Sequence, residues 1–276
     1  MTRMIHGVSG AALILCAGLA ATPAQAQALQ DRFWLEASAY WPNVDTKIEV
    51  SSVQRPDVGT EIDFEQDLDL TDRKTLPAFF AGARLGSNFS VGLEYYSLSR
   101  KGEQVIDRDI TFDDVTYPVN ANVSSKFTTD VYRLTVGYAF LRKENYEFGA
   151  ALGLHATDFE VKLEGQGSVG GAASSVQARK RDVLAPLPTI GLFGAWEIAP
   201  KLTINGRVDY LSLKIDDYDG RLINAQAAIS YRFHKNIGAG VMYRYVDYRV
   251  DVDKENWQGR VSYEFSGPSI FLQVGF

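Results

Sequence analysis

Hydrophobic and polar residues alternate along many short stretches of this chain, with a period of two residues. In 202–210, apolar residues and Gly206 take the even positions, whereas Thr203, Asn205 and Arg207 take odd ones. A period of two indicates a β-strand with two different faces. Ten stretches are predicted to be strands: 33–41 (continuing toward 51), 76–85, 89–100, 131–141, 146–162, 184–198, 202–215, 222–233, 237–250 and 255–276.

The segments between these stretches fall into two classes. The short turns lie at 87–88, 142–145, 199–201 and 234–236. The mostly longer and more polar segments lie near 52–74, 106–124, 165–180, 216–221 and 251–255. Short turns at one end and long loops at the other are typical of a transmembrane barrel. The pattern therefore predicts an all-β fold, a transmembrane antiparallel up-and-down β-barrel of ten strands, with eight or twelve strands as alternatives.

The polar face of the predicted strands has the composition of a barrel interior. It is rich in Gly and Ala with isolated charges, and aromatic residues recur at strand ends, where barrels carry aromatic girdles. By position in the alternation, the inward ionisable residues are Glu36, Arg84, Glu94, Arg133, Glu147, Glu197, Arg207, Asp209, Arg232, Arg244 and Glu264. Arginine suits bidentate pairing with carboxylates in a confined space. The set is expected to plug a narrow barrel or to line a selective pore, and the width of ten strands favours the plug.

Residues 1–26 have the composition of a secretory signal peptide. Arg3 precedes a short apolar run, and Ala24-Gln25-Ala26 fits a cleavage site for small residues. Cys16, in this segment, is the one cysteine of the sequence, so a mature chain would contain no disulfide. We therefore expect export through the Sec route and the periplasm to the bacterial outer membrane of a Gram-negative cell envelope. Residues 27–276 would form a single barrel domain.

The last strand, 255–276, ends the chain on an aromatic residue. Ile270, Leu272, Val274 and Phe276 occupy alternate positions. A terminal strand of this kind is needed to pair with the first strand and close the barrel. The pattern resembles the C-terminal signature of outer-membrane β-barrel proteins, which the barrel-insertion machinery reads.

The whole mature chain resembles proteobacterial outer-membrane β-barrel proteins of the porin-like and OmpA-like class. The phrases YYSLSR at 95–100, DRDITF at 107–112 and DDYDG at 216–220 are similar to such proteins. The resemblance implies outer-membrane lipid, lipopolysaccharide and the barrel-insertion machinery as partners. It implies no particular activity, and any small-solute ligand stays unknown. The net charge of −6, without a basic stripe, does not indicate a nucleic acid partner.

Apolar positions change parity within the last strand. They are odd in 261–265 and even in 270–276, and Ser266-Gly267-Pro268 separates the two sets. One face can carry both sets only if a residue is inserted, and Gly with Pro suits a bulge. We therefore predict a bulge or break between Ser266 and Ser269, with Ser262 and Glu264 facing inward. The alternative is that 261–265 rises above the bilayer.

Two functions follow from these observations. The first is an integral outer-membrane barrel with a narrow, charge-paired lumen, in a structural or interaction role or as a small-solute channel. The alternative is an enzyme at the barrel rim, acting on lipid or peptide. The motif of omptin-type proteases, a His beside an Asp, is missing, because the chain has no Asp-x-His sequence, and Asp158 falls on the opposite strand face from His155. The residues favour a non-enzymatic role, and we expect no catalytic residues, cofactor or metal.

The segment 61–72 is unusually acidic for its apolar content. Acidic residues alternate with Ile62, Phe64, Leu68 and Leu70. One interpretation is a strand extension above the membrane with one face packed on the rim. The other is a site for divalent cations that bridge lipopolysaccharide, since hard oxygen ligands suit Ca²⁺ and Mg²⁺. Asp216, Asp217 and Asp219 indicate a solvated turn.

Overall fold

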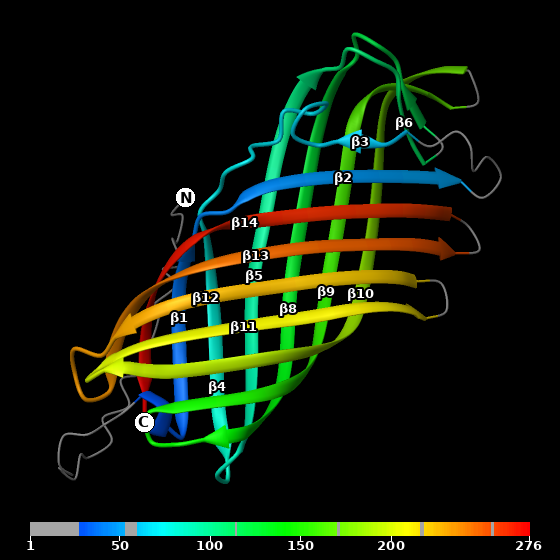
Figure 1. The fold of residues 1–276 in the computed structure, drawn as a ribbon. Helices are drawn as coiled ribbons and strands as arrows, with labels where there is room; N and C mark the ends of the chain where they lie inside the picture. The colour runs from blue at the N-terminus through cyan, green and yellow to red at the C-terminus, as the bar shows by residue number, and fades with distance from the viewer. Residues whose placement is uncertain (1–27, 53–59, 114, 170–171, 216–217, 255–256) are drawn as a thin grey trace, which may run out of the picture.

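The chain forms a closed ring of antiparallel strands, seen in the computed structural model of Figure 1. The structure describes residues 28–52, 60–113, 115–169, 172–215, 218–254 and 257–276. The predicted signal peptide, 1–26, lies outside the described residues, as do Asp216 and Asp217. Among the described residues, no helix is long and apolar enough to cross a membrane.

Ten strand lines, here called staves, make up the ring. After a 3-10 turn, η1 (Ala28–Gln30), the strands are β1 (Phe33–Tyr40), β2 (Asn43–Ser52), β3 (Ile62–Asp63), β4 (Leu76–Leu85), β5 (Phe89–Val105), β6 (Ile110–Phe112), β7 (Val115–Tyr117), β8 (Asn122–Arg142), β9 (Tyr146–Val169), β10 (Ala172–Ala199), β11 (Leu202–Ile215), β12 (Tyr218–Tyr231), β13 (Ile237–Lys254) and β14 (Trp257–Gly275). β1 and β2 form one stave, and β4, β5 and β8 to β14 form the others. β1 pairs with both β4 and β14, which closes the ring. The predicted ten-stranded antiparallel barrel is confirmed.

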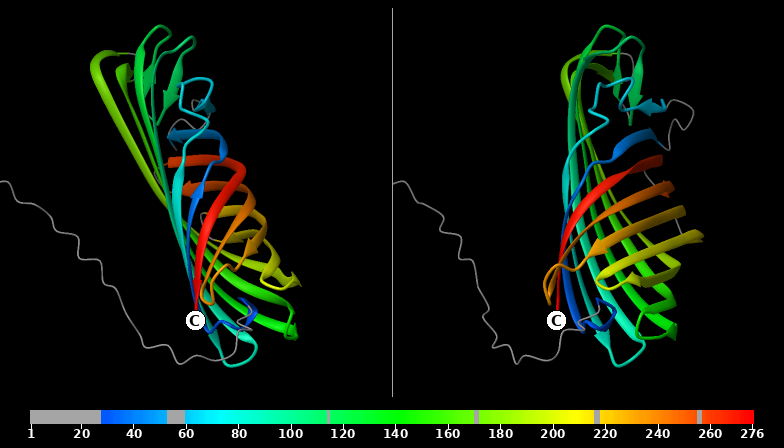
Figure 2. Two further views of the ribbon diagram at one scale, coloured as in Figure 1. Left: turned by 90° about the vertical axis from the view of Figure 1, so that its left-hand side faces the viewer. Right: turned by 60° about the vertical axis from the view of Figure 1, so that its left-hand side comes forward.

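The end of the barrel with the short turns is taken as periplasmic, and the opposite end as extracellular. β5, β8, β9 and β10 extend farther toward the extracellular end than predicted. In the side views of Figure 2, the green strands reach well past the yellow to red ones. The predicted loop at 165–180 is wrong: β9 and β10 continue there as a paired ladder, from Ala172↔Val169 onward. Mutual pairing satisfies the backbone of this Gly- and Ala-rich stretch, so composition alone did not reveal it.

The outward face across the middle of the barrel is apolar, as a lipid-facing surface requires. On β14, Ile270 is 52% exposed, Leu272 is 60% exposed and Phe276, after the strand, is 62% exposed. On β8, Leu134 and Val136 point outward, whereas Arg133 and Thr135, which alternate with them, are buried. The facing predicted for the C-terminal residues agrees with this arrangement.

The predicted bulge in the last strand is wrong. β14 is unbroken, and its register with β13 runs without a shift through Tyr243↔Pro268. Tyr263 and Phe265 point into the barrel and are buried, whereas Glu264 is exposed on the outer face. The parity of apolar residues changes because the barrel changes along its length. Its interior becomes apolar toward the extracellular end, where its exterior becomes polar.

The irregularity lies in the neighbouring stave instead. Trp41 and Pro42 separate β1 from β2, and β14 pairs with β2 up to Ser266 and with β1 from Ser269. A Cβ at Gly267 would lie 2.3 Å from the carbonyl oxygen of Trp41. Gly267 therefore permits the close approach of the interrupted stave.

Neighbouring substitutions in β14 test this facing. We expect Phe265→Ala to lower the free energy of unfolding by about 3–5 kcal/mol, because it removes a buried ring. Glu264→Ala should change it by less than about 0.5 kcal/mol, because the side chain is exposed. Urea unfolding in lipid vesicles, followed by tryptophan fluorescence, measures both. Equal effects would contradict the inward position of Phe265.

Candidate functional site

The interior of the barrel carries the charged residues that the sequence indicated, and its lower end is occupied by the chain's own N-terminal segment. Leu29 in η1 is buried, and its carbonyl oxygen accepts a hydrogen bond from Arg142 at 2.9 Å. Asp31 forms an ion pair with Arg232, with a second contact at 3.2 Å. Both side chains are buried, so this pair anchors residues 28–32 in the periplasmic mouth.

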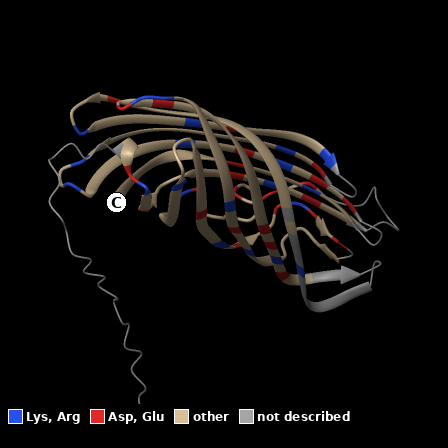
Figure 3. Cartoon of the chain, turned by 90° about the horizontal axis from the view of Figure 1, so that it is seen from below, with Lys and Arg blue, Asp and Glu red and all other residues tan. Residues whose placement is uncertain are grey.

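A network of ion pairs crosses the middle of the interior. Glu94 on β5 contacts Arg133 on β8 at 2.8 Å and also pairs with Arg244 on β13. Arg133 reaches Asp209 on β11 at 3.3 Å, and Arg207 contacts the same carboxylate at 2.7 Å. Charged positions accordingly occur along the strands and not only at their ends (Figure 3). The Glu94–Arg244 and Arg133–Asp209 pairs join staves that are not neighbours in the ring, so the network spans the lumen.

The network is almost fully dehydrated. Asp209 is 0% exposed and Arg133 is 3% exposed. Gln226 accepts a hydrogen bond from Arg244 at 3.0 Å, which adds a neutral partner from β12. A buried charge costs free energy unless it is paired and hydrogen-bonded, so these contacts are required for the charges to remain inside.

The other inward residues lie below this network. Arg84 contacts Glu147 at 3.0 Å, and Glu197 accepts a hydrogen bond from the Lys201 N–H at 3.1 Å, at a periplasmic turn. Glu36 faces the same space and has no ion-pair partner among the residues described. A chamber of about 220 Å³ remains here, lined by residues including Glu36, Arg84, Arg207, Gln226 and Arg244. All predicted inward residues except Glu264 therefore lie on the inner face.

Above the network, the interior is filled by aromatic side chains. Phe265 on β14 packs against Tyr263 at a ring distance of 5.1 Å and against Tyr96 at 6.0 Å. Phe127 on β8 lies 5.6 Å from Tyr263. Phe159 on β9 completes the layer, and all these rings are buried. Stacked and edge-on rings from several staves leave an apolar core where a pore would have to pass.

The acidic segment 61–72 folds over this core. Phe64 and Leu68 are fully buried, and Phe64 lies 5.6 Å from the Phe127 ring. Only Ile62–Asp63 forms a strand, followed by a turn, so the segment is not a long strand extension. Two chain segments, 60–75 and the described residues of 106–121 (106–113 and 115–121), supply buried residues above the barrel and are here called the cap.

The acidic residues of the cap bind groups of the protein itself. Glu65 forms an ion pair with Arg100 on β5, a side chain that is only 1% exposed, and accepts the Thr46 N–H at 2.8 Å. Burial raises the pKa of Glu65, while Arg100 acts in the opposite direction. Asp67 contacts Arg108 at 3.2 Å. The alternative interpretation as a cation site has no cluster of three or more candidate ligands among the described residues.

The cap also completes the barrel wall. In the described part of the chain, β4 pairs with β5 as far as Ala78↔Tyr96, and beyond that point β5 pairs with β8 alone. The segment 60–75 lies between this free edge and β2. A Cβ at Gly102 of β5 would lie 2.2 Å from the carbonyl oxygen of Leu68, so glycine is needed for this close contact.

Neither mature histidine lies at the extracellular rim. His155 is buried inside the barrel in the same register row as Arg133, and Asp158 is exposed on the other face of β9. His234 lies in the periplasmic turn after β12.

The sequence reasoning missed Arg100 and Asp31 as interior ion-pair residues. Even-numbered residues of β5, such as Glu94 and Tyr96, point inward. Continuing this alternation along the strand would have placed Arg100 inside.

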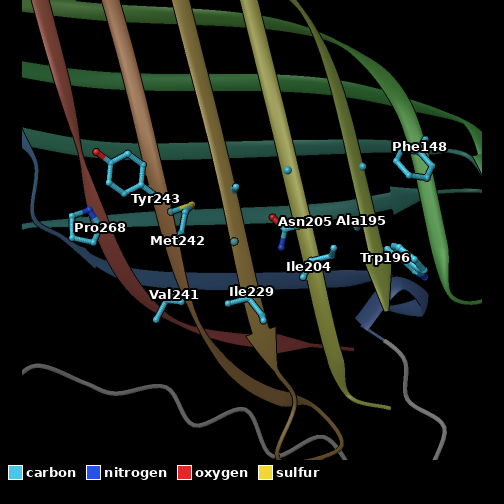
Figure 4. Close-up of a pocket in the computed structure, with 14 residues that line it drawn as sticks. Phe148, Ala195, Trp196, Ile204, Asn205, Ile229, Val241, Met242, Tyr243 and Pro268 are labelled. Carbon is cyan, nitrogen blue, oxygen red and sulfur yellow. The ribbon is translucent and has the colours of Figure 1, made fainter. Parts of the chain in front are cut away.

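A groove of about 780 Å³ lies over β10 to β14 (Figure 4). Gly194, Gly206 and Ala227 occupy one register row there, next to Tyr243. Trp196 and other exposed residues line it, which places it on the lipid-facing surface. The groove is therefore not an entrance to the lumen.

A closed ring of ten staves with an apolar outer band and a charged interior defines an outer-membrane β-barrel. The chain belongs to the outer membrane protein beta-barrel domain family, whose model matches residues 12–265. It is a bacterial outer-membrane protein, as the sequence predicted.

Two solved outer-membrane proteins are similar to the chain at low sequence identity. The outer membrane protease OmpT from Escherichia coli is 12% identical over 88% of this chain and 97% of its own, with a TM-score of 0.57. The toluene transporter TodX from P. putida is 11% identical over 89% of this chain and 90% of its own, with a TM-score of 0.37. No curated protein matches the chain.

Two interior arginines test the network. We expect Arg244→Ala to lower the free energy of unfolding by about 3–5 kcal/mol, because Glu94 loses one of its buried partners. Arg207→Ala should cost about 1–2 kcal/mol, because the Arg207 side chain is more exposed, at 13% against 5% for Arg244, and its pairing is partly offset by solvent. Urea titration of both variants in vesicles measures the difference. The network is misassigned if neither substitution changes the unfolding midpoint.

The ion pair of the cap is tested by two charge-matched substitutions. Glu65→Gln leaves the buried Arg100 without its counter-charge, so we expect amide hydrogen exchange in 60–75 to become at least about tenfold faster. Asp69→Asn is the control, because Asp69 is exposed and its positive φ of 52° suits asparagine. Exchange followed by mass spectrometry should show no change for the control. Equal acceleration in both variants would exclude a special role for the Glu65–Arg100 pair.

Proposed function

We propose that this protein is a closed outer-membrane barrel with a structural or interaction role, and that its lumen does not conduct solutes. The observation that carries the proposal is the succession of three fillings along one axis. The N-terminal segment occupies the periplasmic mouth, the ion-pair network crosses the centre, and the aromatic layer lies beneath the cap.

The energetics of the three fillings support a permanently closed state. Opening the centre would separate buried ion pairs, such as Glu94 with Arg133, which costs about 3–5 kcal/mol for one lost partner. Opening the upper half would expose several aromatic rings, each contributing about 1.5–3 kcal/mol when buried. While these side chains stay in place, no continuous route for a solute runs along the axis of the barrel.

The extracellular part supports an interaction role. β5, β8, β9 and β10 continue past the lipid-facing band as paired strands, and the cap fixes their inner faces. A surface built on packed strands is already ordered before a partner binds, which lowers the entropic cost of association. The alternative functions, a small-solute channel and an enzyme at the rim, have no comparable feature among the described residues.

Planar-bilayer recording tests the closed barrel. We expect the purified, folded protein to give no unitary conductance steps in salt solution, because three layers fill its axis. A general porin added afterwards to the same bilayer is the control for a competent membrane. Reproducible single-channel steps from the wild-type protein would overturn the proposal in favour of the channel.

A further inference from the structure

Four lysines form one row across the outer face of four adjacent strands. In the ladder register, Lys101 on β5 pairs with Lys126 on β8. Lys126 pairs with Lys162 on β9, which pairs in turn with Lys180 on β10. Their strand neighbours Arg100 and Phe127 point inward and are buried, so the lysines point outward. Like charges directly opposite one another destabilise a sheet, so this row requires an explanation.

Two acidic residues of the described part of the chain contact lysines of this row. Glu160 contacts Lys126 at 3.4 Å and Lys180 at 2.9 Å, and Glu164 contacts Lys162 at 2.9 Å. The side chain of Lys126 remains 38% exposed, that of Lys180 53% and that of Lys162 45%. Among the described residues, two carboxylates therefore contact three of the four ammonium groups of the row.

Lys101 is the least neutralised member of the row. It is exposed and has no ion-pair partner in the part of the chain that the structure describes. Nearby acids on this face are engaged elsewhere. Glu103 accepts a hydrogen bond from Asn122 at 2.8 Å, and Asp130 accepts one from Tyr95 at 3.1 Å.

Two tyrosines relate the row to the bilayer. Tyr95 and Tyr132 are exposed, and their ring centres lie 5.1 Å apart. Exposed Tyr and Trp mark the membrane interface. Lys101 and Lys126 each lie six residues farther along their strands. At about 3.3 Å per residue and a tilt of about 45°, the lysines lie roughly 14 Å beyond the tyrosines, outside the hydrocarbon.

The same spacing recurs on the other side of the barrel. Arg249 on β13 lies six residues beyond the exposed Tyr243, and Lys47 on β2 lies six residues beyond the exposed Trp41. Arg221 on β12 pairs with Arg249 in the ladder. Basic residues at a constant distance from the aromatic belt are expected where the surrounding layer is anionic.

We propose that the row of Lys101, Lys126, Lys162 and Lys180 binds the anionic sugar head group of an outer-leaflet glycolipid, through phosphate or carboxylate groups on its sugars. Neighbouring strands lie about 4.8 Å apart, so the row offers several ammonium donors to one polyanionic head group. The phosphates of an ordinary phospholipid lie near the aromatic belt, too low to reach the row. This surface is independent of whether the lumen conducts.

A pair of charge-matched variants tests the proposal. The row variant is K101Q/K126Q/K162Q, and the control is K143Q/K201Q/K235Q, whose lysines lie in periplasmic turns. Heat-modifiable migration verifies that both full-length proteins are folded. Binding of rough-type lipopolysaccharide to the immobilised protein is measured with EDTA present. We expect the row variant to bind at least about tenfold more weakly, with the control unchanged.

The other arms distinguish sources of the anion. Enzymatic dephosphorylation of the lipopolysaccharide should weaken binding if phosphates dominate and leave it intact if sugar carboxylates do, and both results support the proposal. Phosphatidylglycerol vesicles and inorganic phosphate should bind equally weakly to wild type and the row variant. Equal lipopolysaccharide binding by the row variant and wild type would overturn the proposal. So would a row-dependent affinity for phosphatidylglycerol or phosphate that equals the affinity for lipopolysaccharide.

Discussion

The pairing of Glu94 with Arg133 and Arg244 is the contact on which the cross-section of this barrel depends. The lipid-facing surface must be apolar, so the polar side chains of each stave can only point inward. A guanidinium placed inside must find an acceptor, because its desolvation costs several kcal/mol. Glu94 meets this need for two staves at once, and Asp209 does the same for Arg133 and Arg207. Staves that are distant in the ring are therefore held at fixed distances.

The interior changes character along its axis because its surroundings change. At the level of the bilayer, the polar side of each stave faces inward. Beyond the bilayer, the outer face meets water and the inner face becomes the apolar one, as Tyr263 and Phe265 show. The extracellular half is thus organised like a soluble β-barrel, with a core of its own that the cap completes. The two halves share strands but follow opposite rules of solvation.

The sequence was sufficient for the barrel, the number of staves and most inward charges, because alternation is a local signal. It failed at Glu264, since apolar residues were assigned to the lipid-facing side on both sides of the boundary where the solvation rule reverses. It also placed the irregularity at Pro268, although the interruption lies at Trp41 and Pro42 in the neighbouring stave. Strand pairing decides which of two adjacent strands is interrupted. Here the paired strands, β14 and the β1–β2 stave, lie at opposite ends of the sequence. The inward fold of 61–72 depends on Arg100 and Phe127 and was equally invisible locally.

The incomplete wall beside β5 has a consequence for assembly. The segment 60–75 is contacted by β2, β5 and β8, and β2 is held in place by β14, the last strand to be synthesised. The cap therefore cannot acquire all its contacts until the two ends of the chain have met. Burial of its hydrophobic residues therefore accompanies ring closure. The cap thus couples the completion of insertion to the ordering of the cell-surface side.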